Sequence, residues 1–379
     1  MKNRRSNPRI GRRLLAPGPR AGRAASGAEA APPPLQPPPL APRAPAPSPG
    51  LSPQHQKLAL YAGAALVVLI VLVILVLSPT RQPLELVPRG QILVQVVDVR
   101  RFLDSPVYQV LATASHPLLR ALEAKEEKFR ISLRRDVTAV VDTDDSTILL
   151  GRFQPDLMRD CFEQSIETRE KEINRGRQVP VQLQIKQNAV DGYRYLYCDE
   201  EGVDHAFAAV GSSVVCFGDR WGVRRFLKGR AGVRGDALDD PPFAAAFSRS
   251  LARGAFYYRL EKPGGRIVAS KLKDVLGEAG EGVEATFFAI AASRSSITLA
   301  IRFAARDAAA AAKLETQLTK ASSQSALRPL LGADAALALT RSEATVTLES
   351  SIPLDGFDEV VERDKRGQGA NLILTLLAS

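Results

Sequence analysis

The sequence predicts an α+β domain: a largely antiparallel sheet with helices packed on one face, behind a single transmembrane helix. Two observations support this prediction. After residue 90, one local pattern recurs, in which a strand, a short polar turn and a second strand are followed by an amphipathic helix. Hairpins join antiparallel strands, and such helices bury their apolar side on the sheet. Before the domain lies an uncharged apolar stretch, Leu58–Leu77.

The N-terminal segment, residues 1–57, is expected to be a disordered tail. Residues 32–53 contain 11 prolines, and proline both removes an amide donor and fixes φ, which favours an extended chain. Ten basic residues and one acidic residue, Glu29, give the tail a charge of +9. The simplest interpretation is a solvated spacer. The alternatives are contact of the arginines with anionic lipid and docking of the PPPLQPPPL repeat to a protein partner.

Leu58–Leu77 is predicted to cross the lipid bilayer as a helix. Fourteen of its 20 residues are Leu, Ile or Val, and 20 residues of helix span about 30 Å, the thickness of a bilayer's hydrocarbon core. Ser78 and Pro79 end the stretch, and residues 78–89 form a linker. The positive tail favours a cytoplasmic N-terminus. We therefore expect a single-pass protein of the inner or plasma membrane, with its C-terminal domain in the periplasm.

The rest of the chain is nearly neutral, with 41 basic and 40 acidic residues after the tail. A nucleic-acid-binding domain normally carries a clear positive excess. We therefore expect no nucleic-acid partner for the domain.

Residues 90–229 and 230–379 are predicted to form two hairpin–helix halves, or one continuous domain. A strand at Ile92–Val97 opens the first half. Proline in the first turn marks a helix start at Asp104–Pro106, and a charged helix follows at Pro117–Phe129. The four hairpin–helix units are Val137–Asp142 with Thr147–Phe153 and a helix at Pro155–Arg169; Ala206–Val210 with Val214–Phe217 and a helix to Lys228; Thr286–Ala292 with Ile297–Phe303 and a helix to Lys320; and Ala336–Arg341 with Ala344–Ser350 and a helix at Pro353–Arg363.

The second half begins with another predicted helix. Asp239 and Asp240 precede two prolines, and Phe243, Phe247 and Leu251 are spaced four apart, on one face of a helix.

Three stretches resemble a family of uncharacterised bacterial envelope proteins that have one membrane helix and a repeated hairpin–helix domain. They are LVPRGQILVQVVDVRRFLDSPVYQVL (86–111), VVCFGDRWGVRRFLKG (214–229) and LDDPPFAAAFSRSL (238–251). These stretches are patterns of strand, cap and helix. The resemblance implies the architecture and assigns no activity and no site residues.

The segment VVDTDDST, residues 140–147, is the strongest candidate for chemistry. A strand that ends in Asp-x-Asp is similar to the nucleophile loop of haloacid-dehalogenase-type phosphatases, in which Asp142 would attack phosphorus and Asp144 would act as acid and base. Here the segment joins two short strands, and Asp and Ser are common turn residues. We therefore expect a hairpin turn.

The remaining motifs do not support catalysis. The three cysteines, Cys161, Cys198 and Cys216, form no CxxC and no Cys/His cluster. If the strands that carry Cys198 and Cys216 are neighbours, these two could form a disulfide. The glycine-rich stretches lack the phosphate-loop pattern. We expect no catalytic residues, no cofactor and no bound metal.

The densest basic patch of the domain lies in one predicted helix. It consists of Arg220, Trp221, Arg224, Arg225 and Lys228. Such a patch suits a partner or a lipid headgroup, although a solvated helix face has the same composition.

The sequence thus favours a membrane-anchored, non-catalytic interaction or scaffold domain with an unknown envelope protein as partner. A first alternative is a membrane-tethered module that binds a lipid or another apolar ligand between sheet and helices. A second alternative is an unrecognised hydrolase that uses Asp142 and Asp144.

Overall fold

The computed structural model describes residues 83–230, 235–263, 267, 271–323, 327–331, 335–366 and 371–378. All of them belong to one compact unit, Val76–Ser379. The predicted tail, the predicted membrane helix Leu58–Leu77 and residues 78–82 of the linker lie outside the described residues. Within the ranges that are described, no helix is long and apolar enough to cross a membrane.

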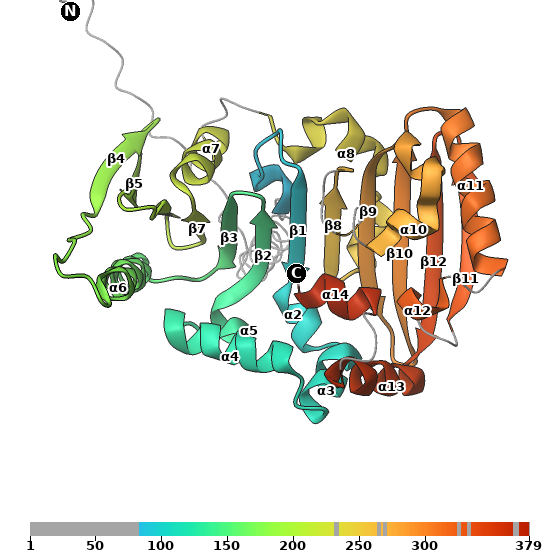
Figure 1. The fold of residues 1–379 in the computed structure, drawn as a ribbon, viewed down its shortest axis with the longest axis horizontal. Helices are drawn as coiled ribbons and strands as arrows, with labels where there is room; N and C mark the ends of the chain where they lie inside the picture. Colours follow the sequence, from blue (N-terminus) through green and yellow to red (C-terminus); the bar gives the residue numbers. More distant parts are fainter. Residues whose placement is uncertain are drawn as a thin grey trace, which may run out of the picture. The chain divides into compact units, whose positions relative to one another are not determined.

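One twelve-stranded antiparallel sheet organises the described residues (Figure 1). Its order is β11-β12-β10-β9-β8-β1-β2-β3-β7-β6-β5-β4. The strands are β1 Leu93–Asp98, β2 Val137–Thr143, β3 Ser146–Gly151, β4 Lys186–Val190, β5 Tyr193–Cys198, β6 His205–Val210, β7 Val214–Gly218, β8 Tyr257–Glu261, β9 Val283–Ala292, β10 Ser296–Ala305, β11 Ala336–Ser342 and β12 Thr345–Pro353.

The sheet has a similar arrangement on either side of the antiparallel β1–β8 pair. On one side β1 is followed by the hairpin β2–β3, and β7 of the hairpin β6–β7 pairs with β3. On the other side β8 is followed by the hairpin β9–β10, and β12 of the hairpin β11–β12 pairs with β10. The first side carries the additional strands β4 and β5. The sheet is continuous across the β1–β8 pair.

Four helices, α2, α3, α4 and α9, begin after a residue whose side chain accepts a hydrogen bond from an amide of the first turn. Ser105 accepts a hydrogen bond from Tyr108 N, and Pro106 occupies the first turn, as the sequence predicts. The helices are α2 Val99–Leu103, α3 Pro106–Thr113, α4 Pro117–Phe129, α5 Leu133–Asp136, α6 Pro155–Asn174, α7 Arg220–Arg230, α8 Pro241–Ala246, α9 Arg249–Gly254, α10 Lys273–Leu276, α11 Ala308–Ser323, α12 Arg328–Leu331, α13 Leu354–Lys365 and α14 Leu372–Ala378, with 3₁₀ turns η1 Pro83–Leu86, η2 Ala237–Asp239 and η4 Gly277–Gly282.

Helices pack on both faces of the sheet, so the prediction of helices on one face is wrong. The first core joins one sheet face to α3, α6, α11, α13 and α14, and the second core joins the other face to η1, α7 and α8. The reason is visible in β9, where Phe288 and Ile290 enter the first core while Phe287 and Ala289 enter the second. Strands with apolar side chains on both faces need cover on both faces.

The predicted helix with Phe243, Phe247 and Leu251 on one face is also wrong. The chain forms α8 and α9 instead, because Phe247 is extended, with φ −62° and ψ 134°, and Ser248 caps α9 by accepting a hydrogen bond from Leu251 N. The sequence analysis did not identify the central strand β8 or the C-terminal helix α14.

Candidate ligand-binding cavity

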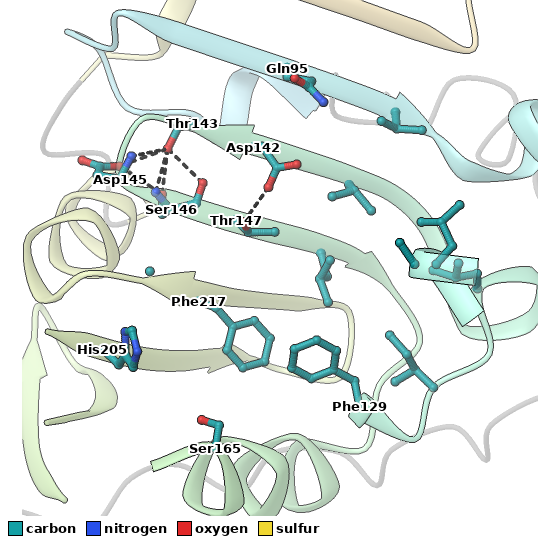
Figure 2. Close-up of a pocket in the computed structure, with 18 of the residues that line it drawn as sticks. Gln95, Phe129, Asp142, Thr143, Asp145, Ser146, Thr147, Ser165, His205 and Phe217 are labelled. Atoms are coloured by element: carbon teal, nitrogen blue, oxygen red, sulfur yellow. Dashed lines mark hydrogen bonds between the residues drawn. The ribbon is translucent and has the colours of Figure 1, made fainter. Parts of the chain in front are cut away.

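A cavity of about 1010 Å³ lies on the side of the first core. Its floor is the sheet face formed by β1, β2, β3 and β7, and its other walls come from α4, α6 and α14. Figure 2 shows the strands of the floor, with Ser165 of α6 across the space from them. The helices thus do not close directly onto this part of the sheet.

Most of the cavity wall is apolar. Val97, Val140 and Leu149 are direct cross-strand neighbours on β1, β2 and β3, and all three line the cavity. Val97 and Val140 remain half-buried although they lie in interior strands. The rings of Phe129 and Phe217 line the space side by side and contact each other, with 5.7 Å between their centroids (Figure 2). Leu118, Leu122 and Phe162 complete the apolar wall from the helices.

A second row of cross-strand neighbours on the same face is polar. Gln95, Asp142 and Thr147 lie opposite one another on β1, β2 and β3, and all three line the cavity. Thr147 Oγ1 donates a hydrogen bond to Asp142 (Figure 2). Gln95 is 6% exposed, and its Oε1 accepts a hydrogen bond from Arg259 Nη1 at 3.4 Å. Polar side chains are therefore built into the wall of an otherwise apolar space.

Arg259 continues this row onto β8, where it lies opposite Gln95. The Arg259 guanidinium is 1% exposed and forms an ion pair with Glu261 at 2.8 Å. Glu261 also accepts a hydrogen bond from Ile267 N at 2.8 Å. The buried positive charge is thus matched by a buried carboxylate behind the cavity wall.

The segment VVDTDDST forms a hairpin turn and divides its three aspartates among different environments. Asp142 faces the cavity. Asp144 is exposed and accepts a hydrogen bond from Ile92 N at 3.2 Å. Asp145 forms an ion pair with Arg225 at 3.1 Å, and its carbonyl accepts a hydrogen bond from Asp219 N. Gly222 allows this approach, since a Cβ there would lie 2.4 Å from the Asp145 carbonyl oxygen.

The predicted basic patch is distributed along α7 with different partners. Arg220 forms an ion pair with Asp199 at 2.6 Å and lies 4.2 Å from the Tyr197 ring centroid. Arg225 pairs with Asp145. Trp221 is 66% exposed, with the Arg224 guanidinium 5.5 Å from its ring centroid, and Lys228 is half-buried. Two of the four cations are thus held in ion pairs, and Trp221 with Arg224 forms the outer part of the patch.

The cysteines are free thiols, and all three are buried. Cys198 lies on β5 in the first core and Cys216 on β7 in the second core, with β6 between the two strands. The possible Cys198–Cys216 disulfide is therefore not formed. Burial raises the pKa of both thiols, which keeps them protonated and unreactive.

The helix α4, which forms one wall of the cavity, is held at its start by His116. This side chain is 6% exposed. Its Nδ1 accepts a hydrogen bond from Leu118 N at 3.3 Å, and its Nε2 lies 3.2 Å from Asp364 of α13. His116 therefore ties the cavity wall to the second half of the domain. His205, in contrast, is exposed at the cavity margin on β6.

Within the part of the chain that the structure describes, no group of three or more His, Cys, Asp and Glu side chains could hold a metal ion. Asp142 and Asp144 do not converge with a third acidic or histidine side chain in such a group. The feature that the sequence analysis missed is Gln95, a polar residue inside the apolar strand LVQVV. Because side chains alternate along a strand, Gln95 identifies the face of β1 that borders the cavity. The alternation does not show that a cavity lies beside that face.

Comparisons with known proteins give distant structural neighbours. No family model matches the chain, and no curated protein matches it. Crystal form III of TP0453 has 10% identity and a TM-score of 0.40, and the match covers 74% of this chain and 98% of that chain. Crystal form I of TP0453 has 12% identity and a TM-score of 0.39, with coverage of 75% and 98%. At these values the similarity assigns no function, and the resemblance to the envelope family stays a prediction.

Proposed function

We propose that the domain is a membrane-tethered binding module for a lipid or another apolar small molecule, which it holds in the cavity between the sheet and α4, α6 and α14. The observation that carries this proposal is the cavity of about 1010 Å³. Small-molecule sites usually occupy about 300–1,000 Å³ and are mostly apolar. The volume and the lining of this space fit that description.

The partial exposure of Val97 and Val140 supports the same function. Interior-strand valines are normally covered, because each buried side chain contributes about 1.5–3 kcal/mol to stability. Here the helices cover Val97 and Val140 only in part. A bound apolar molecule would remove the remaining exposed surface from water and recover part of that free energy.

This function is favoured over the scaffold hypothesis, because a scaffold needs an outer surface and gains nothing from an internal cavity. The predicted membrane helix Leu58–Leu77 fits either function, since it would hold the domain beside a lipid source. We propose that the domain is extracytoplasmic, with the basic tail in the cytoplasm. We also propose that it is non-catalytic.

The test uses the full chain in phosphatidylcholine vesicles and an alkyl diazirine, a photoreactive apolar probe. After irradiation, the labelled residues are mapped by peptide mass spectrometry. We expect adducts on Leu122 and Phe129 in the cavity. Labelling of Leu58–Leu77 serves as the internal reference for probe in the bilayer.

Two tryptophan variants separate binding in the cavity from surface labelling. Ser165 of α6 lines the cavity, and its Oγ donates to Phe162 O; Ser323 of α11 makes the same local bond to Lys320 O but is exposed. Ser165→Trp is expected to abolish the cavity adducts, and Ser323→Trp to leave them unchanged. Equal labelling of both variants, or adducts confined to the apolar segment, would exclude cavity binding.

A further inference from the structure

One side of helix α7 carries an aromatic ring and two cations that face away from the core. Trp221, Arg224 and Lys228 are spaced three and four positions apart, so they follow one side of the helix. The opposite side is buried in the second core through Val223 and Phe226. None of the first three residues is fully buried, and we call them the outer face of α7.

The domain itself matches the outer face of α7 only in part. Trp221 is the single tryptophan of the chain and is 66% exposed, with the Arg224 guanidinium near its ring. The other two arginines of the basic patch are held in ion pairs, whereas no carboxylate among the described residues lies within ion-pair distance of Arg224 or Lys228. In and after η1, the exposed Glu85 and Arg89 offset one another in charge. Two positive charges and an exposed indole therefore remain available to a partner.

An anionic lipid surface matches both features of this face. Indole rings are enriched where a membrane meets water, because the ring is apolar and its N–H is polar. Each Lys or Arg near an anionic membrane surface strengthens binding about fivefold. The lipid phosphates would bind the two cations, and the boundary between head groups and acyl chains would receive the indole.

Helix α7 also lies beside the point at which the chain enters the domain. Leu77, at the end of the predicted membrane helix, precedes Pro83 of η1 by six positions, and six extended residues span at most about 22 Å. Helix α7 packs against η1, and a Cβ on Gly229 would lie 3.9 Å from the Cβ of Pro88. If Leu58–Leu77 crosses the bilayer, as predicted, the short connection keeps the start of the domain, and α7 with it, close to the membrane surface.

We propose that the outer face of α7 docks on anionic lipid head groups of the bilayer that Leu58–Leu77 crosses. The Trp221 indole enters the head-group region, and Arg224 and Lys228 bind lipid phosphates. None of these three side chains lines the cavity, and α7 covers the opposite sheet face. Docking therefore depends on the predicted membrane helix and does not depend on a ligand in the cavity.

The test uses the fluorescence of Trp221, which is unambiguous because the chain has no other tryptophan. The full chain is reconstituted in phosphatidylcholine vesicles with or without phosphatidylglycerol, an anionic lipid. The phosphatidylcholine is brominated near the head-group end of its acyl chains, so that it quenches an indole that touches the bilayer. We expect bromine quenching to be about fivefold stronger with phosphatidylglycerol. High salt should return it to the level seen without phosphatidylglycerol, because salt screens the attraction.

Two double variants separate the outer face of α7 from the overall charge of the domain. Arg224→Gln with Lys228→Gln removes both cations of the face, and we expect the effect of phosphatidylglycerol on Trp221 to disappear. Lys313→Gln with Lys320→Gln is the matched control, because it removes two exposed cations from helix α11 in the other half. We expect this control to keep the full effect. Each variant is compared with itself in vesicles without phosphatidylglycerol, which cancels any change in the emission of Trp221.

Several results would overturn the docking proposal. If brominated lipid does not quench Trp221 and acrylamide in the water quenches it equally in both kinds of vesicle, the face does not touch lipid and is left to a protein partner. Equal bromine quenching with and without phosphatidylglycerol would show that the indole inserts without help from the cations. Equal losses in the two double variants would replace a specific face by general attraction of the domain.

The result also stays separate from the proposed binding function. If the chain does not float with phosphatidylcholine vesicles in a density gradient, the predicted membrane helix is wrong, and docking through α7 is wrong with it. Diazirine labelling of the cavity should be the same in both double variants. A failure of docking with normal cavity labelling would therefore leave the binding function standing.

Discussion

The two sides of the sheet differ in how completely the helices fill the first core. Beside β9 and β10 the core is filled, and Phe288, Leu299, Ile301 and Phe303 are at most 1% exposed. Beside β1, β2, β3 and β7 the same face borders a cavity, and Val97, Val140 and Phe217 remain half-buried. The same order of hairpin and helix thus gives two different results. We call the half that contains β9 and β10 the filled half, and the half that contains β1, β2, β3 and β7 the hollow half.

The difference follows from the side chains of the covering helices. Helix α11 buries three alanines, Ala310, Ala311 and Ala321, together with Leu314 and Leu318. Helix α6 is longer and buries Met158, Cys161, Phe162 and Ile166, none of which is an alanine. The two halves share their order of hairpin and helix, so the side chains that fill the core, rather than the topology, distinguish the half with the cavity from the filled one.

The largest expected effect compares two phenylalanines on this face. Phe288→Ala in the filled half should lower the free energy of unfolding by about 3–5 kcal/mol, because it leaves a new cavity in a dense core. Phe217→Ala in the hollow half should cost about 1–2 kcal/mol, because part of its ring already borders open space. Urea denaturation of the full chain, followed by circular dichroism, measures both. Equal losses would mean that the hollow half is filled in solution.

The next effect concerns the wall of the hollow half. His116→Ala removes the cap of α4 and the contact with Asp364, and we expect a loss of about 1–2 kcal/mol. Hydrogen exchange should accelerate in Pro117–Phe129. Ser105→Ala is the control, since it removes the side-chain cap of α3. Accelerated exchange in α4 with that variant as well would show that α4 has no anchor of its own.

The next prediction concerns how the free energy of unfolding depends on alkaline pH. It depends on Cys216, which is fully buried on the sheet face opposite the cavity. Burial raises the pKa of this thiol above its ordinary value of 9.0. Above pH 9 the unfolded chain therefore releases the proton of the Cys216 thiol, whereas the folded protein keeps it. The contribution of this thiol to the free energy of unfolding is fully present below pH 9 and is lost as the pH rises above 9. At pH 10 the loss is about 1.4 kcal/mol.

The measured quantity is the difference in unfolding free energy between pH 7 and pH 10, which cancels the packing cost of a substitution. Cys216→Ala should reduce that difference. An unchanged difference would show that water reaches the second core behind the cavity strands.

The smallest effect separates two members of the predicted basic patch. Arg225→Ala should cost about 1 kcal/mol, because it leaves the mostly buried Asp145 carboxylate of the cavity hairpin without its ion pair. Arg224→Ala should change stability by less than about 0.5 kcal/mol, as is usual at a surface. Thermal unfolding of the two variants gives the comparison. Similar losses would indicate that the patch acts as one unit.

Several local features could be predicted from the sequence, because their signals lie within a few residues. The start of α3 depends on Ser105 and Pro106, and the turn of the cavity hairpin depends on Thr143, whose hydroxyl accepts from Ser146 N at 3.0 Å. The antiparallel sheet follows from the hairpins. In contrast, β8 contains Arg259 and Glu261, and buried charges make a central strand resemble a surface segment.

The candidate site could be predicted only in part. Asp142 was singled out, but for catalysis with Asp144, and the two side chains lie in different environments. Gln95 was not singled out, because one polar residue in an apolar strand has many explanations. Its role depends on facing a cavity that no nearby residue determines.

The sequence by itself determined the hairpins, the caps and the apolar segment Leu58–Leu77, because hydrogen bonds and periodicity act between near neighbours. Only the tertiary structure decided that β1 pairs with β8, that helices cover both faces, and that the first half is hollow. The distance between a helix and a sheet depends on the combined volumes of side chains from distant parts of the chain. The cavity and its polar row therefore exist only in the assembled fold.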